Sequence, residues 1–136
     1  MEANLRGLVC NDRRIARALR LVTHDMSIRV TLGEAATAAG LKPAYFSRRF
    51  RAMTGMCFAE WSTRVRMEEA KSLLRVIDLS ITAVAAAVGY SDITTFERAF
   101  RRVVRTCPRE IRRLASNQDC LAAISQALRA EEPGLL

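Results

Sequence analysis

Arginines occupy matching positions in two similar segments of this sequence. Their guanidinium groups are the side-chain groups here best suited to bind a partner through charge and hydrogen bonds. Arg48 follows Phe46 by two residues, and Arg98 follows Phe96 at the same interval. A guanidinium can donate two hydrogen bonds to O6 and N7 of a guanine, or it can bind a phosphate oxygen. Two helices with this pattern could therefore contact a nucleic acid at two places.

A helix over each segment would turn its phenylalanine inward and leave an outer face free for contacts. We predict contacts to base edges from Ala44, Ser47 and Arg48 in the first segment, and from Ile93, Thr94, Glu97 and Arg98 in the second. Serine and threonine can donate or accept there, and glutamate can accept from N4 of a cytosine. Nearby cations set the position on a duplex by binding phosphates. As phosphate contacts we predict Lys42, Arg49, Arg51, Arg101, Arg102 and Arg105.

The two segments belong to a longer internal repeat. Residues 31–50 and 80–100 each predict a short helix, a turn at a glycine (Gly40 or Gly89) and a second helix. The aligned positions, with one residue inserted in the second turn, include Leu32 with Ile81, Ala36 with Ala85, Phe50 with Phe100 and Cys57 with Cys107. Glycine supplies the backbone angle that a tight turn needs, and a small alanine lets the second helix pass close to the first. The pattern is that of a helix-turn-helix, and it is present twice.

The composition favours an all-α protein. Half of the 136 residues are apolar, only 6% are aromatic, and glycine and proline are few. We predict seven helices, over about residues 12–25, 31–40, 43–54, 58–77, 80–89, 92–103 and 108–111, and a further amphipathic helix over 119–130. In the long helix we place Trp61 in the core, and we assign the polar positions to Arg64, Arg66, Glu68, Glu69 and Arg75.

The predicted organisation is two helix-turn-helix subdomains joined by a long linker helix. We place a leader at 1–11, the first subdomain at 12–57, the linker helix at 58–77, the second subdomain at 78–115 and a C-terminal extension at 116–136. A rigid helix of this length spans about 30 Å, and major-groove faces on one side of B-DNA repeat at about 34 Å. We therefore expect one chain, as a monomer or weak dimer, to reach two adjacent grooves of double-stranded DNA.

The balance of charge fits a nucleic-acid partner. The sequence has 22 basic and 14 acidic residues, a formal net charge of +8, and nearly all of its basic residues are arginine. Four scattered cysteines form no CxxC pair and there is one histidine, so we predict buried thiols, no metal site, no cofactor and no catalytic residue. No apolar run is long enough for a membrane span and no signal peptide is recognisable. We expect a cytoplasmic, nucleoid-associated protein that does not contact a membrane.

Several segments resemble the DNA-binding domain of the AraC/XylS family of bacterial transcription regulators. They are residues 39–50 (AGLKPAYFSRRF), 66–74 (RMEEAKSLL), 84–92 (VAAAVGYSD) and 96–100 (FERAF). The resemblance covers about residues 12–113, and residues 12–19 resemble a subgroup in which this domain follows a cupin-type sensor. It implies a two-lobed fold of seven helices, base contacts at the positions named above, and recruitment of RNA polymerase, commonly as an activator. Because the family's usual sensor is missing from this sequence, we expect the detached DNA-binding part of a larger regulator rather than a stand-alone one.

The sequence departs from the family pattern mainly in the second unit. Arg105 stands where family members often have glycine, Ile93 where proline is common, and Ile111 where an aromatic residue is usual. A non-glycine residue in the left-handed conformation at position 105 would cost about 1 kcal/mol. The first unit matches the pattern more closely, and residues beyond 115 have no clear counterpart.

The leading interpretation is a sequence-specific DNA-binding regulator, and two other functions are compatible with the residues. A non-specific or architectural DNA binder would use the same charge but would bind all sequences equally, whereas a specific one binds its site far more tightly than random duplex. A helical adaptor for another protein would have no affinity for a duplex at moderate salt. An enzyme is the least favoured class, because the sequence offers no phosphate-binding glycine loop, no HExxH and no second histidine.

Overall fold

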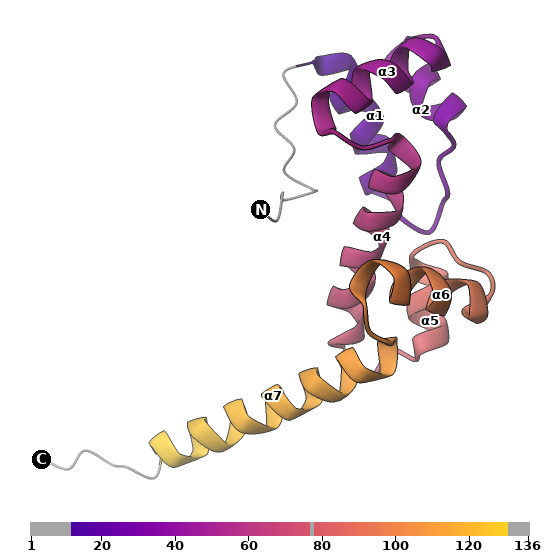
Figure 1. Cartoon of the computed structure of the whole chain (residues 1–136). Helices are drawn as coiled ribbons and strands as arrows, with labels where there is room; N and C mark the ends of the chain where they lie inside the picture. Colours follow the sequence, from indigo (N-terminus) through magenta and orange to yellow (C-terminus); the bar gives the residue numbers. More distant parts are fainter. Residues whose placement is uncertain (1–11, 77, 131–136) are drawn as a thin grey trace, which may run out of the picture.

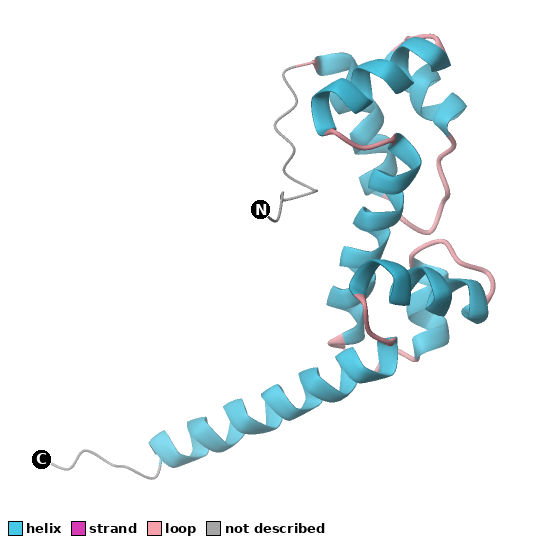
Figure 2. Ribbon diagram, in the orientation of Figure 1, coloured by secondary structure: helices cyan, strands magenta, loops and turns pink. Residues whose placement is uncertain are grey.

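The protein is all-α over the residues that its computed structural model describes, 12–76 and 78–130. The helices are α1 (Arg13–His24), α2 (Leu32–Ala39), α3 (Pro43–Thr54), α4 (Phe58–Leu74), α5 (Ile81–Ala87), α6 (Ile93–Val104) and α7 (Pro108–Ala130). Figure 1 shows α1, α2 and α3 grouped at one end of α4, and α5 and α6 at its other end. Figure 2 shows that only loops join the helices, and the predicted fold class is confirmed.

Several helices begin at a residue whose side chain accepts a hydrogen bond from a backbone N–H of the first turn. These residues are Asp12, Thr31, Ser80 and Asp92. Thr31 Oγ1 accepts from the backbone N–H of Glu34 and donates to Glu34 Oε1, both at 3.2 Å, so Thr31 caps α2 and also contacts the carboxylate of its first turn. Such caps satisfy backbone groups that a helix end leaves without partners, and they explain why α2, α5 and α6 start where the sequence predicts.

The buried side chains form two separate apolar clusters. The first cluster joins α1, α2 and α3 to the N-terminal half of α4, and its centre is an aromatic group of Phe46, Phe50, Phe58 and Trp61. The second cluster joins α5 and α6 to the C-terminal half of α4. We call the parts around them the first lobe (residues 12–65) and the second lobe (residues 67–115). Because α4 contributes to both clusters, it is a structural part of each lobe as well as the connection between them.

The linker helix is slightly shorter than predicted. It was expected over 58–77, and α4 ends at Leu74, where tight turns from Arg75 N–H to Ser72 O (3.3 Å) and from Val76 N–H to Leu73 O (3.0 Å) close it. Residue 77, the leader at 1–11 and the last residues of the predicted extension, 131–136, lie outside the described residues. The subdomain boundaries themselves stay predictions.

The C-terminal end of the chain corrects the prediction of two separate helices over 108–111 and 119–130. Residues from Pro108 to Ala130 form one continuous α-helix, α7, of 23 residues. The intervening residues, 112–118, are mostly good helix formers, with only Ser116 and Asn117 weaker, and they include no glycine or proline that would stop the backbone hydrogen bonding. Arg112 ties the start of α7 to the end of α4, because its Nε donates to Leu74 O at 3.2 Å and its Nη2 donates to Val76 O at 3.3 Å. Figure 1 shows the rest of α7 projecting away from both lobes.

Candidate nucleic-acid interface

The first helix-turn-helix is formed by α2, a glycine turn and α3. Gly40 has the positive φ of 69° that favours glycine, and its N–H donates to Thr37 O at 3.0 Å. The next N–H, of Leu41, donates to Ala36 O at 2.9 Å. Pro43 then begins α3, where its missing N–H costs no hydrogen bond. The chain therefore turns sharply directly after α2, and Ala36 is fully buried beneath the turn.

The second unit repeats this turn bond for bond. Gly89 has a φ of 88°, and its N–H donates to Ala86 O at 3.1 Å. The N–H of Tyr90 donates to Ala85 O at 2.9 Å, which matches the Leu41 bond of the first unit. The helix that follows, α6, begins at Asp92, whose carboxylate accepts from the backbone of Thr94 and Thr95. The internal repeat seen in the sequence is thus a repeat of hydrogen bonds and not of composition alone.

Both second helices bury the same pair of rings. α3 and α6 are each 12 residues long, and Phe46, Phe50, Phe96 and Phe100 are fully buried. The ring centres lie 5.9 Å apart in the first pair and 5.7 Å apart in the second. Since the inner faces correspond, the residues between the rings correspond on the outer faces as well.

The outer faces carry the residues predicted to contact bases. Arg48 and Arg98 are exposed, and within the described residues neither side chain makes an ion pair or a hydrogen bond. The other predicted base contacts are also exposed, except Ser47, which is half-buried: Ala44, Ile93, Thr94 and Glu97. The pKa of Asp92 is lowered mainly by the hydrogen bond from the Thr95 hydroxyl (2.8 Å), with a smaller effect from the charge of Arg98. The arrangement leaves two guanidiniums free to bind an external partner.

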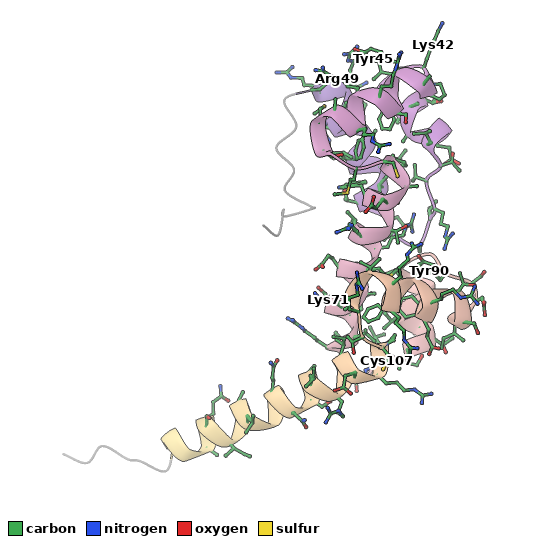
Figure 3. All side chains as sticks on the ribbon, viewed as in Figure 1. Lys42, Tyr45, Arg49, Lys71, Tyr90 and Cys107 are labelled. Atoms are coloured by element: carbon green, nitrogen blue, oxygen red, sulfur yellow. The ribbon has the colours of Figure 1, made fainter. Side chains whose placement is uncertain are left out.

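The residues predicted to contact phosphates are all exposed: Lys42, Arg49, Arg51, Arg101, Arg102 and Arg105. Figure 3 shows Lys42, Tyr45 and Arg49 at the end of the first lobe that is far from the second lobe. Arg49 differs from the others because its Nε lies 3.6 Å from a carboxylate oxygen of Asp12. A phosphate at Arg49 would therefore compete with an internal ion pair, in which the Arg49 side chain is 49% exposed and the Asp12 side chain is 9% exposed.

Arg105 occupies the left-handed conformation that the family resemblance implies for it. Its φ is 70°, and it is the only non-glycine residue with a positive φ in the described ranges. Its N–H donates to Arg101 O at 3.0 Å, as the N–H of Gly55 donates to Arg51 O at 2.8 Å after α3. The second helix of each unit therefore ends in the same conformation, with glycine at this position in the first unit and arginine in the second. Only the arginine is strained by its left-handed backbone.

The comparisons with known proteins agree with this geometry. A family model described as a helix-turn-helix domain matches residues 35–114, more than half of the chain. The chain is also 34% identical to the regulatory protein PocR of Salmonella typhimurium (strain LT2) over 113 residues. The chain belongs to the AraC/XylS family of helix-turn-helix transcription regulators. The match covers 82% of this chain and 37% of PocR, so the chain spans well under half of that relative.

Solved structures of AraC/XylS-type domains have the same fold. The C-terminal domain of AraT, a response regulator from Geobacillus stearothermophilus, is similar with a TM-score of 0.71 and 30% identity, over 75% of this chain and 85% of that one. The DNA-binding domain of AdpA, solved in complex with a target DNA, has a TM-score of 0.72. At 24% identity, over 77% of this chain and 95% of that one, the likeness to AdpA is one of fold.

Two groups of residues depart from the sequence analysis. The four cysteines were expected to be buried thiols, but Cys57, at the N-cap position of α4, is exposed and Cys107, directly before α7, is half-buried. Cys10 and the side chain of Cys120 lie outside the described residues. Arg66 was assigned to the polar face of the linker helix, but it is buried. The sequence did contain a signal, because Arg66 shares its four-residue spacing with three apolar residues and therefore lies on their face of the helix. All five positions of this series are buried: Phe58, Ser62, Arg66, Ala70 and Leu74.

Other kinds of site find no support in the described part of this AraC/XylS-family chain. No group of three or more His, Cys, Asp or Glu side chains there could hold a metal ion. None of the described helices has both the length and the apolar character needed to cross a membrane.

Proposed function

We propose that this chain binds one specific sequence of double-stranded DNA by placing α3 and α6, the recognition helices, in two successive major grooves. The observation that carries the proposal is the pair of equivalent outer helices, each anchored by two buried phenylalanines and each exposing an arginine at the same position. A helix fits the major groove of B-DNA, where every base pair presents a distinct pattern of donors and acceptors.

The proposed contacts to bases follow from the chemistry of the exposed side chains. Arg48 and Arg98 each suit a guanine, since a guanidinium can donate to O6 and N7 together. Glu97 suits a cytosine, whose N4 amino group donates in the major groove. The remaining base contacts would come from Ala44, Ser47, Ile93 and Thr94, and the phosphate contacts from Lys42, Arg49, Arg51, Arg101, Arg102 and Arg105.

A single copy of the chain is sufficient for this mode of binding. α4 has 17 residues and is therefore about 25 Å long, and each recognition helix belongs to the lobe at one of its ends. Successive major grooves on one face of the duplex lie about 34 Å apart. We infer a monomer or weak dimer that recruits RNA polymerase in the context of a longer regulator with a sensor domain, and family membership supports this inference.

The proposal is tested by selecting bound sequences from a random duplex pool and then measuring affinity at several salt concentrations. We expect two groups of enriched bases, centred about one helical turn apart, and a selected site bound about 1,000-fold or more tightly than random duplex. Equal affinity for all sequences would instead favour the non-specific DNA binder. Absence of duplex binding at moderate salt would favour the protein adaptor.

Substitution of the two matching arginines tests which helices make the base contacts. We expect Arg48→Ala and Arg98→Ala each to weaken the selected site by about 1–3 kcal/mol and to relax the preference at one base pair. Arg20→Ala is the matched control, because Arg20 is exposed on α1, outside both recognition helices. An equal loss on selected and random duplex would show that the arginine binds a phosphate and not a base.

A further inference from the structure

A buried arginine lies at the boundary between the two lobes. Arg66 is 4% exposed, and among the described residues it is the only charged side chain in the buried class. Its neighbours along α4 belong to different clusters, since Val65 packs in the first lobe and Met67 in the second. Burial is the main cause that lowers the pKa of Arg66, and the nearby charge of Arg29 adds to it. An arginine nevertheless stays charged in proteins, so its donors need acceptors.

The acceptors of Arg66 come from both lobes. Its Nη1 donates to Met26 O, and its Nη2 donates to Ile28 O at 3.0 Å, in the loop between α1 and α2. Nη1 also donates to Val88 O at 3.0 Å, in the turn between α5 and α6. One planar guanidinium thus connects the loop before the first helix-turn-helix to the turn within the second. A rigid group with fixed donor directions holds these two segments in one relative position.

A second arginine makes a parallel connection at the surface. Arg29 Nε donates to Gly89 O at 3.0 Å, and its guanidinium carbon lies 4.3 Å from the centre of the Tyr90 ring. Tyr90 in turn packs against Phe96 of α6, with ring centres 5.7 Å apart. Figure 3 shows Tyr90 on the side of the second lobe that faces the first. A loop of the first lobe is therefore linked through two contacts to the buried face of the second recognition helix.

Gly89 shows how closely the lobes approach each other. A Cβ atom at Gly89 would lie 2.5 Å from Arg66 Nη1 and 3.0 Å from Met26 O. The equivalent Gly40 has a similar positive φ, but a Cβ there would meet nothing within 4 Å. Both glycines serve the turn, and only Gly89 also leaves room for the contact between lobes.

We propose that Arg66 and Arg29 are positioning residues that set the number of base pairs between the two halves of the DNA site. The inference rests on the proposed function, in which α3 and α6 enter two grooves. One inserted base pair moves the second groove by about 3.4 Å and turns it by about 35°. A junction held by hydrogen bonds, whose lengths vary by only a few tenths of an ångström, cannot follow that movement. If the two lobes could instead rotate freely about α4, the chain would still bind a site with an inserted base pair.

The first experiment measures affinity for the selected site with its central spacer changed by minus one, zero, plus one and plus two base pairs. For the unaltered chain we expect a loss of about 10-fold or more on the first step from the best spacer, the size of one mismatched base pair. Arg29→Ala and Arg66→Met should reduce this loss to about threefold or less. Gly89→Ala should do the same, while its matched control, Gly40→Ala, should keep the spacer dependence of the unaltered chain.

The spacer dependence separates positioning from a purely structural role. A variant that is only less stable loses affinity equally at every spacing, so unchanged spacer ratios in Arg29→Ala and Gly89→Ala would overturn the proposal. Arg29 is exposed, so Arg29→Ala remains informative if Arg66→Met does not fold. The proposal would also be overturned if the unaltered chain bound sites of every spacer length with equal affinity.

A second experiment does not depend on DNA binding. Residual dipolar couplings measured by NMR on the free chain report whether two lobes share one orientation. We expect one alignment tensor to fit both lobes of the unaltered chain, and two different tensors to be needed for Arg29→Ala and Gly89→Ala. Two tensors in the unaltered chain would refute the junction. A single tensor together with no specific DNA site would refute the proposed function and leave the junction standing.

Discussion

Replacing Arg105 with glycine should make the protein more stable and its binding to DNA weaker. Arg105 combines a φ of 70° with an exposed guanidinium at the end of the second recognition helix. The first unit makes the same helix end with Gly55, at a φ of 77°. The Arg105→Gly change therefore removes a strained backbone conformation and a predicted phosphate contact together.

The expected gain in stability is the difference between two backbone effects. A non-glycine residue in the left-handed region costs about 1–2 kcal/mol, whereas glycine loses about 0.5–1 kcal/mol of additional chain entropy on folding. Arg105→Gly should thus stabilise the protein by about 0.5–1 kcal/mol, or about 2–4 °C in melting temperature. The reverse change, Gly55→Arg, should destabilise by a similar amount, because a Cβ at Gly55 meets no atom within 4 Å and only the backbone strain is added.

Thermal and urea unfolding measure the first effect, and duplex binding as a function of salt measures the second. We expect the salt dependence of Arg105→Gly to fall by about one unit of log–log slope, with an equal loss on selected and random duplex. Arg105→Lys is the control that keeps the charge, and it should retain both the slope and the stability of the unaltered chain. A melting temperature that stays the same or falls in Arg105→Gly would refute the strain argument, and an unchanged slope would refute the phosphate contact.

Further predictions concern the packing of the recognition helices and their stability in acid. Phe46→Ala and Phe96→Ala should each lower the free energy of unfolding in urea by about 3–5 kcal/mol, as the loss of a fully buried aromatic ring does. Tyr45→Ala, at a position 43% exposed, is the control and should lower it much less. Equal losses in all three variants would mean that the ring pairs do not anchor the recognition helices in the core. The hydrogen bond from Thr95 is the main cause that lowers the pKa of Asp92 below its ordinary value of 3.8. A carboxyl group whose pKa is lower in the folded than in the unfolded state stabilises the folded protein at any pH above the unfolded pKa. This stabilisation is lost as the pH falls through the folded pKa. The melting temperature should therefore fall at pH values below 3.8, and less steeply in Asp92→Asn, whose amide caps the helix without titrating; identical pH profiles would contradict this.

Much of the site could be predicted from the sequence because its determinants are local. Gly40 and Gly89 end their helices by a backbone angle that glycine adopts easily, and the capping residues act within a few positions of themselves. The spacing of Phe46 and Phe50 is one helical turn, so their common burial follows from helix geometry. The strain at Arg105 was expected from the family resemblance, because family members often have glycine at that position.

Other features escaped prediction because their causes are distant in sequence or small in energy. Arg66 takes its acceptors from residues that are 22 to 40 positions away, and nothing next to it in the sequence indicates them. The continuity of α7 depended on whether Ser116 and Asn117, which are weaker helix formers than their neighbours by only fractions of a kcal/mol per residue, interrupt the helix.

The amino-acid sequence alone therefore determined the two helix-turn-helix units and the arginines that they expose, since turns, caps and the helical period act over a few residues. The tertiary structure decided how the units are held relative to each other. That relation depends on Arg66 and Arg29 bonding to backbone carbonyls of remote loops, and backbone carbonyls are present at every residue, so no pattern of residue types marks the ones that will be used.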